Sequence, residues 1–87
     1  MNEIEIKKLI GKYANEMHKA IGKTIDAFMI ANELPEDAVT LNITFNALAN
    51  NLQAIVENNK DIPAESVELM IQSLTHKLRK AVQSRCN

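Results

Sequence analysis

Residues 38–56, AVTLNITFNALANNLQAIV, contain no charged side chain, although 24% of the residues in the whole chain are charged. A helix on a protein surface usually carries charged residues on the side that faces water. The apolar residues of this stretch step by three and four, which is the spacing of one face of an α-helix. This face, called the seam below, comprises Ala38, Leu41, Phe45, Leu48, Leu52 and Ile55. The stretch is therefore predicted to be a helix with one continuous apolar face.

A second side of the same helix carries neutral amides in place of charges. This amide row consists of Asn42, Asn46, Asn50 and Gln53. Charged groups are depleted from interface cores, whereas amides can form hydrogen bonds across a contact. We therefore expect this helix to be covered on more than one side, near the centre of a homo-oligomer, with Asn42, Asn46 and Asn50 at the subunit contacts. The alternative is a polar groove for a ligand or a partner protein.

Two prolines divide the chain at similar sequences, ELPEDAVTLNI at 33–43 and DIPAESVELMI at 61–71. Proline disfavours helical geometry in the residue before it and is tolerated in a first turn, so we expect Pro35 and Pro63 to start helices. The similarity is either a shared helix-entry sequence or the trace of an old duplication. No stretch alternates like a strand. The prediction is a single all-α domain, 1–87, with helices at about 3–32, 36–58 and 64–84.

The connectors between the predicted helices are short, which favours antiparallel neighbours. The first helix, at about 45 Å, would be longer than the others. Its overhanging end carries apolar residues that one short chain can hardly cover: Ile4, Ile6, Leu9 and Ile10. This overhang is a second reason to expect a homo-oligomer.

The sequence Ile-Gly-Lys occurs twice, at residues 10–12 and 21–23. Only the second half of a phosphate-binding loop is present, because no glycine lies five residues before Gly22 and the preceding residues have a helical pattern. Eleven residues make about three helical turns, so Gly11 and Gly22 fall on one side of the first helix. This glycine line is predicted to contact another helix of the oligomer and comprises Gly11, Asn15, His18 and Gly22.

The rest of the first helix divides into an apolar stripe and, on the opposite side, a lysine row. The stripe consists of Ile6, Ile10, Tyr13, Ala14, Met17, Ile21, Ile25 and Phe28; the row consists of Lys8, Lys12, Lys19 and Lys23. The row is either a solvated surface or an anion site. In the second case an anionic ligand would meet ammonium groups and an aromatic ring, and the candidate residues are Lys12, Tyr13, Lys19 and Lys23.

Catalytic and metal-binding patterns are not found in the sequence. His18 and His76 are the only histidines, and no His, Cys or carboxylate spacing fits a metal site, so no enzyme, cofactor or metal is expected. A single cysteine, Cys86, and the lack of a secretory signal pattern predict a free thiol and a cytoplasmic protein. No membrane span is expected.

Residues 40–49, TLNITFNALA, resemble a helix of the small phage proteins that sequester cyclic nucleotide signals and so block the CBASS defence. In that family a Leu-x-Ile/Leu-Thr run precedes an alanine five residues after the Thr, and Leu41, Ile43, Thr44 and Ala49 occupy those places. The aromatic, proline-containing N-terminal segment of the family and its tryptophan are absent here. The resemblance implies a helical homo-oligomer that binds a nucleotide without turning it over. No ligand-binding residue of the family is assigned to a position of this sequence.

Two functions from different classes fit these patterns. The first is a non-catalytic oligomeric binding or inhibitor protein, of phage or accessory type, that sequesters an anionic small molecule such as a nucleotide or occupies a partner protein. The alternative is a dimeric nucleic-acid-binding transcriptional regulator that uses the lysine row or the basic end of the third helix. The net charge of −1 argues against binding nucleic acid through a basic surface.

Overall fold

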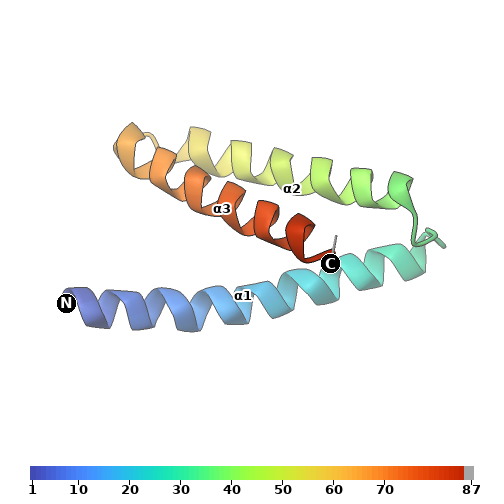
Figure 1. Ribbon diagram of the computed structural model, residues 1–87, viewed down its shortest axis with the longest axis horizontal. Coiled ribbons are helices and arrows are strands. Elements are labelled where there is room, and N and C mark those ends of the chain that lie inside the picture. Colours follow the sequence, from blue (N-terminus) through green and yellow to red (C-terminus); the bar gives the residue numbers. More distant parts are fainter. Residues whose placement is uncertain (86–87) are drawn as a thin grey trace. The chain divides into compact units, whose positions relative to one another are not determined.

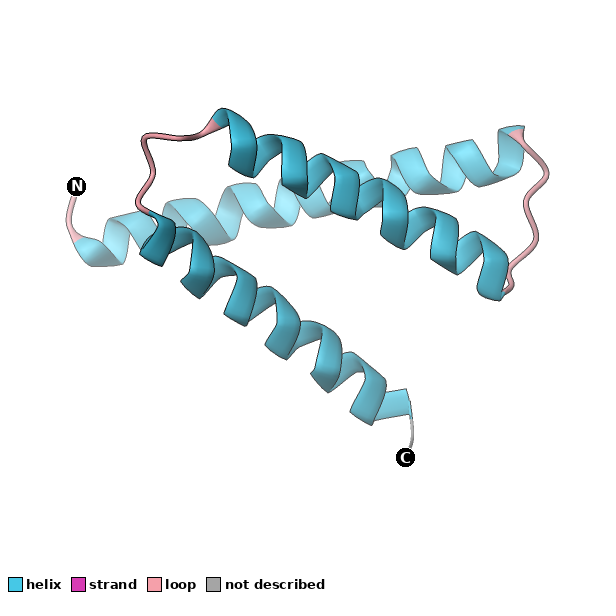
Figure 2. Ribbon diagram, turned by 90° about the horizontal axis from the view of Figure 1, so that it is seen from above, coloured by secondary structure: helices cyan, strands magenta, loops and turns pink. Residues whose placement is uncertain are grey.

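The computed structural model describes residues 1–85 and contains three helices, α1 (Glu3–Ala31), α2 (Ala38–Asn58) and α3 (Ala64–Arg85) (Figure 1). No strand occurs among these residues, and loops join successive helices (Figure 2). The all-α prediction and its three helices are confirmed, whereas Cys86 lies outside the described residues. The chain divides into two compact units, one of Met1–Asn46 and one that begins at Ala47, within α2.

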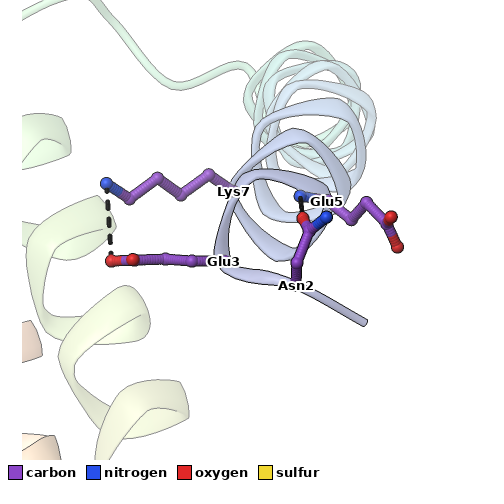
Figure 3. A network of polar contacts seen from close by, with 4 residues as sticks. All are labelled: Asn2, Glu3, Glu5 and Lys7. Atoms are coloured by element: carbon purple, nitrogen blue, oxygen red, sulfur yellow. Dashed lines mark hydrogen bonds and ion pairs between the residues drawn. The ribbon is translucent and has the colours of Figure 1, made fainter.

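Helix α1 begins at a capped N-terminus (Figure 3). The side-chain oxygen of Asn2 accepts a hydrogen bond from the backbone N–H of Glu5 at 2.8 Å. Glu3 and Glu5 lie in the first turn, where carboxylates complement the helix dipole. Lys7 pairs with Glu3 at 3.9 Å, but both side chains are well exposed, so this ion pair adds little stability. The start of α1 is therefore determined by its own first residues.

The end of α1 has the hydrogen bonds of a Schellman motif. The backbone N–H of Leu34 donates to the carbonyl of Met29 at 2.9 Å, and that of Glu33 donates to the carbonyl of Ile30 at 3.2 Å. Glu33 has φ of 51°, the left-handed conformation that this motif requires and that glycine usually provides. Met29 and Leu34, the two positions that commonly touch in this motif, are both half-buried.

Helix α2 begins at Ala38, two residues after the predicted start at 36, because Asp37 rather than Pro35 caps it. One side-chain oxygen of Asp37 accepts from the backbone N–H groups of Val39 and Thr40, both at 3.0 Å. At α3, Pro63 directly precedes the helix, and its carbonyl accepts from Ser66 at 3.0 Å. The two similar proline sequences therefore start their helices in different ways.

Packing within the described residues is confined to a few positions. In the first unit, Thr40 is buried, with 4% of its surface exposed, and Gly22, Ile25, Met29, Leu34 and Thr44 are half-buried. In the second unit, Ser66 and Val67 are half-buried. None of the described apolar side chains is fully buried within either unit.

Replacing Glu33 by glycine should stabilise the protein by about 0.5–1 kcal/mol, because glycine adopts the left-handed conformation without a steric cost. Urea unfolding followed by circular dichroism, at one fixed protein concentration, measures the change. Glu36→Gly is the matched control, since Glu36 lies in the same connector without positive φ. Equal effects of the two variants would contradict the assignment.

Replacing Thr40 by valine should stabilise the protein by about 1 kcal/mol. The Thr40 hydroxyl is buried and has no hydrogen-bond partner in the described chain, and valine has nearly the same shape without that cost. Thr44→Val is the control, because the Thr44 hydroxyl does donate to the Thr40 carbonyl at 3.0 Å. Thermal unfolding at fixed concentration should rank Thr40→Val above the wild type and Thr44→Val at or below it.

Candidate functional site

The dominant surface feature of this chain is exposed apolar area. Large apolar side chains on all three helices contribute to it, among them Met17 at 65% exposure, Phe28 at 57% and Leu41 at 51%.

On α1 the half-buried residues and the apolar stripe lie on different sides. At 100° per residue, Gly22 and Met29 fall on the glycine line, and Ile25 lies between this line and the centre of the stripe. The centre of the stripe is about 110° further round the helix. Apart from Ile25, every stripe residue is exposed. The chain's own packing thus uses Gly22, Ile25 and Met29 and leaves most of the apolar stripe uncovered.

Helix α2 is divided in the same way. Thr40 and Thr44, its only residues that are not exposed, lie one turn apart on one side. The seam is centred about 90° away from them. Its large members are all exposed, from 38% at Leu48 to 54% at Ile55. The side of α2 that is covered within the chain was missed by the sequence analysis; the signal available was a pair of threonines four residues apart in an uncharged helix.

The glycine line is open along most of its length. Gly11, Asn15 and His18 are exposed, and Gly22 is half-buried. A Cβ atom built on Gly11 or Gly22 meets no atom within 4 Å beyond its own local helix. Within the described chain, therefore, neither glycine is required by a close approach, and a contact that needs them would have to come from another molecule.

The amide row makes most of its hydrogen bonds along its own helix. The side-chain N–H of Asn46 donates to the backbone carbonyl of Asn42 at 2.9 Å and also to the Asn42 side-chain oxygen. Gln53 donates to the Glu57 carboxylate at 2.9 Å. Asn50 has no side-chain hydrogen bond among the described residues and lies almost opposite the seam. Part of the hydrogen-bonding capacity of the amide row is therefore already used within α2.

Among the predicted ligand residues, the structure brings Lys12 and Tyr13 together. The Lys12 ammonium lies 5.3 Å from the centre of the Tyr13 ring, within cation–π distance. Lys19 and Lys23 are one turn apart, about 6 Å along the axis, whereas Lys12 is about 10 Å from Lys19. Within residues 1–85 none of these three lysines forms an ion pair with a carboxylate. One compact anion could meet Lys19 and Lys23, but only an extended one could also reach Lys12.

No three His, Cys, Asp or Glu side chains in residues 1–85 gather where they could hold a metal ion. No helix within this range combines the length and the apolarity needed to cross a bilayer.

The glycine line can be tested as an intermolecular contact. Leucine is the better helix former by up to about 1 kcal/mol and meets no obstacle near its Cβ within the chain, so Gly11→Leu should raise helicity if no other molecule packs there. If the line is a subunit contact, the same variant should reduce the mass of the assembly measured by light scattering. Lys8→Leu, on the lysine row, is the control for added apolar surface; an unchanged assembly in both variants would remove the glycine line from the interface.

Comparison with protein-family models, curated proteins and solved structures finds no significant match to this chain. The resemblance of residues 40–49 to the phage proteins stays a prediction. What the chain binds has to follow from its own surfaces, of which the exposed apolar faces are the largest.

Proposed function

We propose that this protein is a non-catalytic binding protein that works as a homo-oligomer of antiparallel helices. The observation that carries the proposal is the absence of any buried apolar side chain in residues 1–85. Single helices of this length are marginally stable in water, and their stability in proteins comes mainly from packing an apolar face. Covering the stripe of α1 and the seam of α2 with further copies of the chain supplies that packing.

The lysine row of α1 is the proposed ligand site. Its ammonium groups lie on the side of α1 opposite the apolar stripe, so the site remains accessible when the stripe is covered. The spacing of Lys12, Lys19 and Lys23 suits a molecule with at least two anionic groups about 10 Å apart. Tyr13, at the edge of the stripe nearest the lysine row, lies beside Lys12 and offers an aromatic face to a planar ring. A nucleotide with two separated phosphate groups has both features, and sequestering it needs no catalytic group.

A nucleic-acid-binding regulator is the second candidate, and it is favoured by one observation. Lys8, Lys12, Lys19 and Lys23 form a straight row about 22 Å long without an ion pair to a carboxylate in the described chain. Such a row could follow a phosphate backbone. Binding that is strong at low salt and falls steeply as salt rises would support this candidate over the small-molecule one.

Native mass spectrometry of the freshly purified protein tests the assembly and the ligand together. We expect a multiple of the 9.7 kDa chain with a few hundred additional daltons at each site. Lys12→Glu combined with Lys23→Glu should remove the additional mass and leave the assembly intact, because the row lies away from the apolar stripe. Lys60→Glu with Lys77→Glu makes the same change of charge elsewhere and should keep the ligand. A monomer in the wild-type spectrum would contradict the proposed function.

A further inference from the structure

We propose that two copies of the chain join through their α2 helices, seam against seam. This inference rests on the proposed self-association and names the surface that carries it. It differs from a contact through the glycine line of α1 or through the amide row of α2, which are the other surfaces that could join two copies.

The position of the seam on α2 is the first argument. The chain itself covers the side of α2 that carries Thr40 and Thr44, and the seam lies about 90° away from that side. All of its large side chains are exposed, although they form one continuous apolar face of α2. Their burial is the largest gain that α2 can make on meeting another chain.

The chemistry of the seam's borders is the second argument. Neutral residues flank the seam on both sides, for example Asn42 and Ala49 on one side and Thr44 and Asn51 on the other. Two such helices can approach closely without burying a charge. The apolar face of α3 is bordered instead by Glu68 and Arg79 on one side and Lys77 on the other. The partner that fits α2 best has an apolar face with uncharged borders, and a second α2 helix has such a face.

The period of the seam is the third argument. Its residues alternate steps of three and four, a seven-residue repeat that keeps one face in contact with an equally wound partner. The stripe of α1 repeats after eleven residues, as in Ile6, Met17 and Phe28, which corresponds to a different winding. Two helices whose apolar faces repeat with different periods drift out of contact along their length. The seam of α2 therefore matches a second α2 better than it matches α1.

The length of the seam suits such a pair. Its exposed large side chains extend from Leu41 to Ile55, about four turns of α2. The chain's net charge of −1 produces little repulsion between copies.

Cysteine cross-linking in a Cys86→Ser background tests the pairing. On parallel helices Leu48 faces Leu48 of the second copy, whereas antiparallel seams that overlap fully place Leu48 opposite Phe45 and Leu41 opposite Leu52. A disulfide requires Cα atoms less than about 7 Å apart. We expect oxidation to convert most of the chains into a covalent dimer on a non-reducing gel, from Leu48→Cys alone if the helices are parallel and from a mixture of Leu48→Cys and Phe45→Cys chains if they are antiparallel. The control on the same helix is Asn50→Cys, almost opposite the seam, which should cross-link several times less.

A second set of variants guards against a loss of folding in Leu48→Cys, which circular dichroism would reveal. Parallel helices should cross-link Leu41→Cys with itself, and antiparallel helices should cross-link Leu41→Cys only with Leu52→Cys from a second chain. Cross-linking at Met17→Cys or Asn50→Cys but not on the seam would overturn the pairing. The pairing would also be overturned if the double variant Leu48→Cys with Leu74→Cys formed only an intrachain disulfide, because the seam would then be covered by α3.

Light scattering on the same Cys86→Ser protein separates the two proposals. An oligomer without seam cross-links would overturn the α2 pairing and leave the proposed function in place. A monomer would overturn both, since no copy would then cover any apolar face. An oligomer with cross-links at Leu48→Cys and few at Asn50→Cys is the result that supports both.

Discussion

The cost of leaving apolar side chains in water is the constraint on which the rest of this structure depends. Each helix has well-placed local signals, yet helices of this length need an apolar face packed against something to be stable in water. No described apolar residue is fully buried by the chain itself. The stability of the folded helices therefore depends on what covers these faces, because a partner that binds only the folded form also stabilises it.

Helices α1 and α2 each divide their surface between two tasks. Gly22 and Met29 on α1 and Thr40 on α2 occupy the sides that the chain covers. Most of the large apolar residues of the two helices occupy sides about a quarter of a turn or more away. A chain that packed all of its large side chains internally would have little left to offer a partner. This division fits the subunit of the proposed oligomer.

The sequence was sufficient to predict the helices because their signals are local. Pro35, Pro63 and the three- and four-residue steps of apolar residues located the three helices to within two residues. The start of α2 was displaced because Asp37, and not Pro35, accepts the first free N–H groups. The Schellman motif was missed because Glu33 occupies a position where glycine is the usual signal.

The candidate site was less accessible to sequence analysis. Periodicity identified which residues share a side of α1 or α2, but it could not tell which side the chain covers, since that depends on contacts between residues distant in sequence. The pairing of Asn42 with Asn46 and the closeness of Lys12 to Tyr13 depend on side-chain orientations that spacing does not specify. Periodicity was enough to place the lysines in one row. Only the structure shows that, among the described residues, they form no ion pair with a carboxylate.

The turn between α1 and α2 has a consequence for the order of events in the proposed assembly. Its hydrogen bonds join residues no more than five positions apart, such as Leu34 and Met29, so it can close quickly within a single chain. Meeting another copy is slower at low concentration, because that step is bimolecular. A chain whose turn has already formed brings its apolar faces to the encounter with less conformational freedom to lose. Loosening this turn would raise the entropic cost of association even though every apolar face stayed intact.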